Sequence, residues 1–195
     1  MALPAGETRR RRMERGERRE AILAAARKVI AAVPDVESVA IEEIAEQAGI
    51  SRALVYEYFG DRARLIDELR SRLAAELAEE MDASTARAVD AHTLLTELAD
   101  AHLRFAEAGI GTYRLARSSS LRFAAEVAAR LGGGDDGRLI AAVTVEGLCA
   151  FASEWAAGSE LERERAVALI VSFLEGGLNA VRRLPSPAGV RDHGG

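Results

Sequence analysis

The sequence of 195 residues has one cysteine, Cys149, and only four prolines. A single thiol excludes an intrachain disulfide, which fits a reducing compartment. No run of about 20 unbroken apolar residues occurs, and the charged N-terminus lacks an apolar stretch of signal-peptide length, so we expect a cytoplasmic protein without a membrane span. Strand-like alternation of apolar and polar residues is also missing, which predicts an all-α fold.

The sequence also lacks the residue patterns that are typical of catalytic sites and metal sites. The three histidines show no metal-ligand spacing, Cys149 has no obvious histidine partner, and no Gly-rich phosphate loop follows a strand. The paired carboxylates Asp135 and Asp136 lie in a Gly-rich segment, where solvation explains them. We therefore expect no metal, no cofactor and no enzyme activity, with an all-helical enzyme as a remote alternative.

The formal net charge of −5 is unevenly distributed. Residues 1–30 carry nine Arg or Lys against four Glu, whereas residues 71–195 carry 13 basic against 18 acidic side chains. A basic end on an acidic body predicts a polyanion partner for that end. A charge run by itself is also compatible with a solvated, disordered tail.

What the sequence does contain is a series of helical patterns divided by short breaks. We expect helices at about residues 16–32, 41–48, 51–59, 61–81, 85–107, 112–117, 121–131, 138–157 and 161–184. The Gly-rich segment 132–137 is expected to be a flexible turn. This organisation predicts a basic flexible arm over residues 1–15, a small helical domain over 16–66, a larger one over 67–184 and a flexible tail over 185–195.

Two of the expected helices, 41–48 and 51–59, are short and joined by a tight turn. Gly49 can adopt a positive φ without steric cost and so ends the first helix, and the Ser51 hydroxyl can cap the second. Val55 and Phe59 lie four residues apart and anchor the second helix inward. This pattern is typical of a helix-turn-helix, whose second helix enters the major groove of DNA. A helical hairpin can serve packing alone, but the basic arm and the nearby aromatic residues favour DNA binding.

The stretch AIEEIAEQAGISRALVYEYFGDRARLIDEL, residues 40–69, resembles the DNA-binding domain of the tetracycline-repressor (TetR-like) family of bacterial transcription regulators. The matching positions are Ile44, Ala45, Ala48, Gly49, Ile50, Ser51, Ala53, Tyr56, Phe59, Arg62 and Leu65. The resemblance covers roughly residues 16–70 and is specific, because many spaced positions agree at once. It implies a homodimeric repressor that binds double-stranded DNA at a palindromic operator and is released by a small effector.

The resemblance assigns DNA contacts to the second short helix and its neighbours. It implies phosphate contacts for Tyr56 and Arg62, and a phosphate or base contact for Tyr58. The candidate base readers stand at the start of the helix, at Arg52, Ala53 and Leu54. The complete set of candidate DNA-binding residues is Ser51, Arg52, Ala53, Leu54, Tyr56, Tyr58 and Arg62, with Arg11 and Arg12 of the arm.

Three positions depart from the family pattern. Ala40 replaces the usual Thr that caps the first short helix, Ala53 replaces the commoner Gly, and Leu54 replaces the commoner Thr or Ala. Leu54 has no hydrogen-bond donor, so it either reads a thymine methyl group or packs. Glu57 either accepts a hydrogen bond from cytosine N4 or repels phosphates.

The last two expected helices each carry an apolar stripe. By analogy with the family, these helices pair across a two-fold axis as a four-helix bundle. The alternative is that both stripes face the core of a single chain, and both arrangements are compatible with the pattern. The candidate interface residues are Phe151, Ile170, Phe173, Gly177 and Val181.

The resemblance also implies a ligand pocket among the helices between residues 85 and 157. The candidate lining residues are Leu98, His102, Phe105, Tyr113, Phe123, Leu148, Cys149 and Trp155. Because most of these side chains are apolar, we expect a hydrophobic or aromatic effector. His102 and Cys149 are also compatible with a core role. A regulator or architectural protein controlled by a protein partner, without a small-molecule pocket, is the alternative function.

Overall fold

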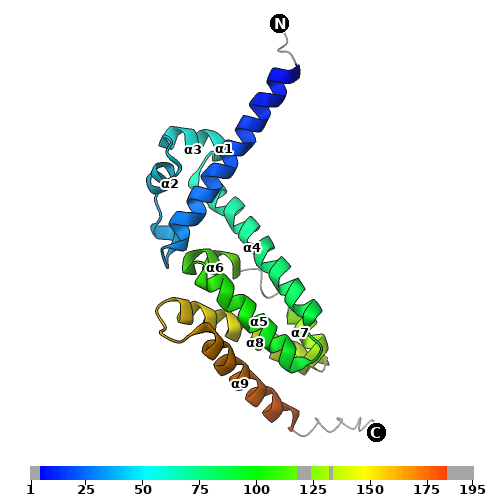
Figure 1. Ribbon diagram of the computed structural model, residues 1–195. Helices are drawn as coiled ribbons and strands as arrows, with labels where there is room; N and C mark the ends of the chain where they lie inside the picture. The colour runs from blue at the N-terminus through cyan, green and yellow to red at the C-terminus, as the bar shows by residue number, and fades with distance from the viewer. Residues whose placement is uncertain (1–4, 118–123, 132–133, 184–195) are drawn as a thin grey trace, which may run out of the picture.

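The computed structural model describes residues 5–117, 124–131 and 134–183 (Figure 1). These ranges form helices and connecting loops with no strand, which confirms the expected all-α fold. The elements are α1 (Ala5–Ala31), the short 3-10 helix η1 (Val36–Ser38), α2 (Ile41–Ala48), α3 (Arg52–Phe59), α4 (Arg62–Arg87), α5 (Ala91–Glu107), α6 (Ile110–Ala116), α7 (Ala124–Leu131), α8 (Gly134–Ala156) and α9 (Arg163–Arg182).

Helices α1 to α3 form a small unit at one end of the molecule, with α2 and α3 beside α1 (Figure 1). Apolar side chains explain this arrangement, because Ile22 of α1, Ile44 of α2 and Phe59 of α3 are all buried in one core. Burial of side chains of this size contributes about 1.5–3 kcal/mol each relative to exposure. The short helices are therefore stabilised by packing, α2 on α1 and α3 on α2 and α4, and not by their own length.

Helix α4 leads from this unit into the larger domain, where α5 packs against α4, α8 and α9 (Figure 1). Leu65 at the start of α4 and Met81 near its end are both buried, so the helix contributes to the core along its length. The core is continuous between the two domains. A displacement of α4 would therefore be transmitted to the small unit.

A second junction between the domains lies where α6 meets the end of α1. A Cβ atom on Gly111 would stand 2.0 Å from the carbonyl oxygen of Ile30 and 2.4 Å from that of Val33. A Cβ atom on Gly109 would stand 2.5 Å from the Cβ atom of Ala31. The backbones approach this closely because neither glycine has a side chain.

Several helix boundaries differ from the expectation. Helix α1 begins at Ala5 and not near Gly16, where the sequence pattern predicted its start, so residues 5–15 belong to the helix. Ala, Glu, Arg and Met in this segment have high helix propensity, which favours continuation of the helix. Helix α5 begins at Ala91, because the Asp90 carboxylate accepts a hydrogen bond from the backbone N–H of Thr93 at 2.7 Å and caps it.

The Gly-rich segment was also partly misjudged. Helix α8 begins at Gly134, so residues 134–137 belong to a helix and not to a turn. Once the long apolar part of α8 is packed, each preceding residue adds a helical hydrogen bond at a small entropic cost, and this overrides the low propensity of glycine. Residues 132–133, Phe123 and the expected tail over 185–195 lie outside the described residues.

Residues 136–156 of α8 are long and apolar enough to cross a membrane by length and composition. In the protein 39% of their apolar window is buried, including Leu148, Cys149 and Ala152 in the core. A core helix passes the same test, so this feature is weak evidence for a membrane span.

Candidate nucleic-acid interface

The turn between α2 and α3 has the predicted geometry. Gly49 adopts a left-handed conformation, with φ 67° and ψ 33°, and its N–H donates to the Glu46 carbonyl oxygen at 3.0 Å. The Ser51 hydroxyl oxygen accepts a hydrogen bond from the backbone N–H of Leu54 at 3.3 Å and caps α3. A positive φ at the end of one helix and a side-chain cap on the next produce the abrupt change of direction.

The cap of α2 is only half formed, as the departure at Ala40 implies. Ala40 has no side-chain oxygen to accept from the first turn of the helix. In the other direction, the Glu43 carboxylate accepts a hydrogen bond from the Ala40 N–H at 2.8 Å. This retained half of the capping arrangement fixes where α2 starts.

Helix α3 presents one side to the core and the other to solvent. Val55 and Phe59 are buried, as predicted, whereas Arg52, Ala53 and Glu57 are exposed. The remaining side chains, Leu54, Tyr56 and Tyr58, are half-buried. The candidate base and phosphate contacts therefore lie on the solvent side or at its edges, where a major groove could accept them.

Arg52 at the start of α3 is held by two other side chains. Its guanidinium forms an ion pair with Glu42 of α2 at 2.5 Å, and donates a hydrogen bond to the Tyr56 hydroxyl oxygen at 3.2 Å. The guanidinium carbon also lies 5.3 Å from the centre of the Tyr56 ring. The hydrogen bond to Tyr56 and the charge of Glu42 raise the pKa of Arg52 above its ordinary value.

Arg62 is bound to its own domain and faces the loop before α2. Its guanidinium donates to the carbonyl oxygens of Val39 at 2.9 Å and Val36 at 2.6 Å, and to the Glu37 carboxylate at 3.1 Å. Three of the five guanidinium N–H groups are used in these bonds. A phosphate contact stays a prediction, whereas the structural role of Arg62 in holding this loop against α4 had no signal in the sequence.

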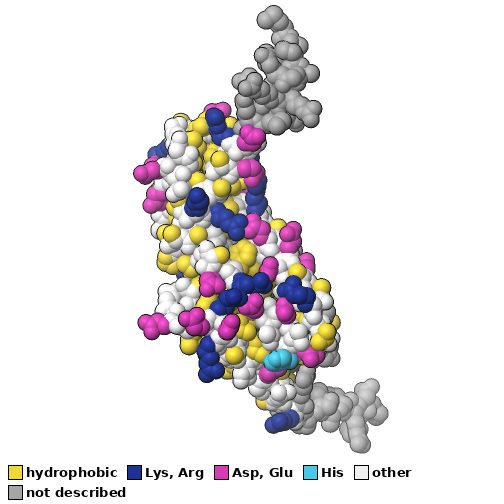
Figure 2. Space-filling model, viewed as in Figure 1, with side chains coloured by type: hydrophobic (Ala, Val, Ile, Leu, Met, Phe, Trp, Pro, Cys, Tyr) yellow, Lys and Arg dark blue, Asp and Glu magenta, His cyan; other side chains and the backbone are white. Residues whose placement is uncertain are grey.

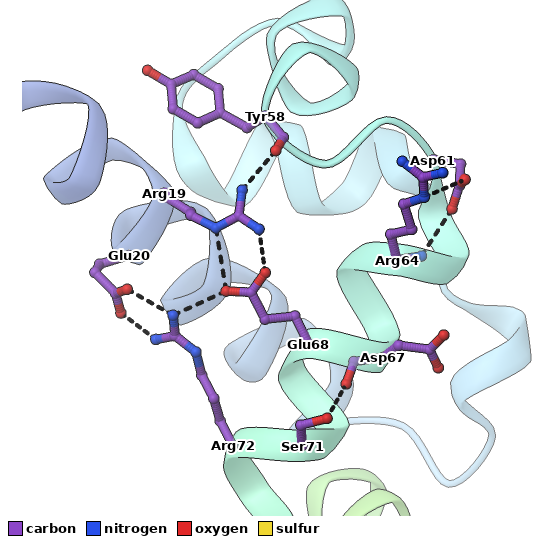
Figure 3. A network of polar contacts seen from close by, with 9 residues as sticks. All are labelled: Arg19, Glu20, Tyr58, Asp61, Arg64, Asp67, Glu68, Ser71 and Arg72. Carbon is purple, nitrogen blue, oxygen red and sulfur yellow. Dashed lines mark hydrogen bonds and ion pairs between the residues drawn. The ribbon is translucent and has the colours of Figure 1, made fainter. Parts of the chain in front are cut away.

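A network of charged side chains joins α1, α3 and α4 (Figure 3). Arg19 of α1 donates to the Glu68 carboxylate of α4 and to the Tyr58 carbonyl oxygen at the end of α3, the latter at 2.6 Å. Its guanidinium also lies 4.3 Å from the centre of the Phe59 ring. Arg19 therefore fixes the end of α3 against both neighbouring helices.

The network continues along the contact between α1 and α4 (Figure 3). Arg72 donates to both oxygens of Glu20, at 2.5 and 2.8 Å, and to Glu68 at 3.0 Å. The hydrogen bond from Arg72 lowers the pKa of the Glu20 carboxyl. Glu20 is 52 positions from Arg72, so no local spacing could have identified this pair, whereas Glu68 and Arg72 lie one helical turn apart on α4.

The candidate arm residues Arg11 and Arg12 lie on the first turns of α1. This end of the helix projects past α3 and away from the rest of the molecule (Figure 1). Contact between these arginines and a phosphate backbone stays a prediction.

The candidate interface residues are divided between the core and the surface. Ile170 is only 5% exposed and belongs to the core, and Phe151 is half-buried against it. Phe173, Gly177 and Val181 are exposed. With Leu139 and Val143 of α8 they line apolar grooves of about 300 and 480 Å³ between α8 and α9.

The candidate pocket residues are mostly packed together inside the larger domain. Leu98, His102, Tyr113, Leu148 and Cys149 are all buried. The Tyr113 hydroxyl lies 2.9 Å from Nδ1 of His102, and the two rings meet edge to face. Burial lowers the pKa of His102 to about 4, because the protein interior does not solvate the imidazolium, and burial also raises the pKa of Tyr113.

Of the three remaining pocket candidates, one lies at the margin of this cluster, one lines a different cleft and one lies outside the described residues. Phe105 is half-buried, with its ring centre 6.4 Å from that of Tyr113. Trp155 lines a separate cleft of about 690 Å³ near the end of α1, where its indole N–H donates to the Leu161 carbonyl oxygen at 2.8 Å. Phe123 is the candidate beyond the described residues.

The face of the larger domain that is seen in Figure 2 has mixed charge. Figure 2 shows Arg and Lys interspersed with Asp and Glu across the larger domain. Arg104 forms ion pairs with Glu80 and Asp100, and Arg163 pairs with Asp100 and Glu107. Within the described ranges, no three His, Cys, Asp or Glu side chains are grouped as a metal site requires.

Comparison with known proteins agrees with this geometry. Residues 22–69 match the family described as bacterial regulatory proteins, tetR family. A TetR-like transcriptional regulator from Rhodococcus sp. RHA1 superposes with a TM-score of 0.70 at 22% identity, over 83% of this chain and 96% of that one. A tetR-family regulator from Streptomyces coelicolor gives 0.69 at 22% identity, over 85% and 82%.

A third similar structure, the crystal structure of RolR in complex with resorcinol, has a TM-score of 0.54 at 17% identity, over 90% of this chain and 98% of that one. No curated protein matches the sequence. The matched residues span the helix-turn-helix described above, and the likeness to solved structures extends the shared fold to the larger domain. Residues 22–69 therefore match the DNA-binding region of bacterial regulatory proteins of the tetR family, and the chain as a whole shares its fold with solved regulators of that family.

Proposed function

We propose that the protein is a homodimeric repressor that leaves a palindromic operator when a small, mainly apolar effector binds. The observation that carries this proposal is the exposed apolar face of α8 and α9. Phe173 is 74% exposed and Val143 is 72% exposed, and both border the same groove. Contiguous apolar surfaces of this kind mark association sites, because their burial removes apolar area from water.

A second copy of the chain is the partner that this face favours. Gly176 and Gly177 of α9 have open space where a Cβ atom would stand, so another helix could approach closely there. Two-fold pairing would also present two copies of α3 to successive major grooves. One helix-turn-helix buries a small area on DNA, and pairing supplies the specificity that a single unit lacks.

The proposed effector site is the cluster around His102 and Tyr113. Its neighbours Leu98 and Leu148 are apolar, and the His102–Tyr113 pair supplies polar groups that could orient a ligand. The resorcinol complex of RolR shows that a protein of this fold binds a small aromatic molecule. An effector releases DNA only if it prefers the conformation that does not bind the operator.

Selection of bound DNA from a random-sequence pool tests the proposal directly. We expect a motif with two-fold symmetry, and a dimer by light scattering at micromolar concentration. An asymmetric motif bound by a monomer would contradict the homodimer. A screen of small aromatic and aliphatic compounds by thermal stability then tests the effector: a compound that stabilises the protein should weaken operator binding, and operator DNA should weaken its binding by the same factor.

A further inference from the structure

The start of the recognition helix offers few groups that can read a base by hydrogen bonding. Ala53 has no polar atom, Leu54 is apolar and half-buried, and the Ser51 hydroxyl is engaged in the cap of α3. Arg52 is exposed and is the one side chain among residues 51–54 with charged donors. Base readout at this end of α3 therefore depends on the orientation of a single guanidinium.

That orientation is set by contacts from two directions. Glu42, in the first turn of α2, pairs with the Nη1 atom of Arg52 at 2.5 Å, while the Tyr56 hydroxyl accepts from Nη2 at 3.2 Å. Arg52 and Tyr56 lie one helical turn apart, so the ring supports the guanidinium from its own helix. Each terminal nitrogen carries two N–H groups, so both retain a donor for a further acceptor.

From this arrangement we infer that Arg52 reads a guanine in each operator half-site and that Glu42 is the positioning residue that aims it. The inference rests on the proposed operator binding and deepens it. Guanine presents two acceptors, O6 and N7, in the major groove, and they match two parallel guanidinium donors. A free arginine loses side-chain entropy when it binds, and a guanidinium already held in place loses less.

The acidic character of Glu42 makes this role distinguishable from a simple surface ion pair. The Glu42 and Arg52 side chains are 56% and 58% exposed, so their ion pair contributes little to folding stability. Close to DNA, however, the carboxylate repels phosphates and weakens binding to every sequence. Removal of the Glu42 charge should therefore increase the affinity of the protein for unrelated DNA and decrease its preference for guanine.

Selection with the Arg52→Ala variant first identifies the operator position at which guanine is no longer preferred. The test then uses the operator with 7-deazaguanine at that position. This base lacks the N7 acceptor and keeps O6. We expect the wild-type protein to bind the modified operator roughly 10-fold more weakly than the natural one. For Glu42→Gln we expect a loss of about 3-fold or less, with stronger binding to unrelated DNA.

Glu46→Gln is the matched control, because Glu46 carries the same charge one turn further along α2 and is also exposed. It should strengthen binding to unrelated DNA without changing discrimination against 7-deazaguanine. Equal discrimination by wild type and Glu42→Gln would overturn the role of Glu42. A symmetric operator in which Arg52→Ala changes no guanine preference would overturn the inference for both residues and leave the proposed operator binding in place. The absence of any selected motif would overturn the proposed operator binding as well.

Discussion

The two surfaces proposed for association are built in opposite ways. On the α2–α3 surface, Arg52 and Arg62 are held by hydrogen bonds and ion pairs within the domain. On the α8–α9 surface, Val143 and Phe173 stand exposed to solvent. DNA is charged and hydrated, and it is recognised by hydrogen-bond donors that point at its bases and phosphates. The side chains that carry these donors therefore have to be oriented before binding. An apolar partner is bound by the burial of apolar surface, which has no preferred direction and requires only that the two surfaces fit together.

Glycine is used differently in the same two regions. At the junction of α6 with α1, the backbone atoms of Ile30 and Val33 fill the place where a Gly111 side chain would stand. On α9, Gly176 and Gly177 face open space. The first arrangement joins two parts of one chain, whereas the second leaves room for another molecule.

The largest effect should come from charging the apolar face. The double substitution Val143→Glu and Phe173→Glu places charges at two exposed positions, so we expect monomers with unchanged helical content. Loss of the second DNA-binding unit should reduce operator affinity by roughly 1000-fold. Light scattering and a quantitative binding assay check both results. Val89→Glu, at a loop position that is 87% exposed and lines neither groove, is the control and should remain dimeric.

The second-largest effect should be a loss of folding stability at acidic pH, caused by His102 in the interior of the larger domain. The pKa of His102 is about 4 in the folded protein and near 6.5 when unfolded, so the unfolded chain binds more protons as pH falls. Between pH 6.5 and pH 4 the stability of the folded protein should therefore fall by about 3 kcal/mol through this group. Urea unfolding at pH 7 and pH 4 measures it. The Gln side chain of the His102→Gln variant cannot titrate. A difference in unfolding free energy between the wild type and this variant that stays the same at pH 7 and pH 4 would therefore contradict the prediction.

A smaller effect is expected from the junction between the domains. Gly111→Ala would force a methyl group against the carbonyl oxygens of Ile30 and Val33, and overpacking of this kind costs about 1–3 kcal/mol. Gly177→Ala meets no atom within 4 Å and should leave the stability of the monomer unchanged or slightly higher. Thermal unfolding of both variants in a monomeric background compares the two sites. Equal stabilities would show that α6 can move away from α1 at little cost.

The smallest effect should come from the helix caps. Ser51→Ala removes the acceptor for the Leu54 N–H and should cost about 1 kcal/mol in stability. Ala40→Thr makes the opposite change at α2, where the side-chain cap is missing, and should stabilise the domain by a similar amount or less. Urea unfolding of the two single variants and their combination measures both effects. The effects should add, because they act on different helices.

Local features of the helix-turn-helix were predictable from the sequence. Gly49 ends α2 and Ser51 begins α3 where the sequence pattern places them, and Val55 and Phe59 are buried as predicted. The helix ends depend on groups within about five residues along the chain, and the spacing of Val55 and Phe59 places both on one side of α3. Such interactions form wherever the residues occur in that order, which is why a single sequence reveals them.

Contacts between distant segments were decided only by the tertiary structure. The Arg19–Glu68 pair joins residues 49 positions apart, and Arg62 bonds to carbonyl oxygens on a loop more than 20 positions away. Ile170 and Phe173 lie in one apolar stripe, yet one is buried and the other exposed. The sequence determines that both are apolar, but which of them faces the core depends on how α5 and α8 pack against α9. Periodicity identifies an apolar face, and only the arrangement of the neighbouring helices determines how much of that face the chain itself covers.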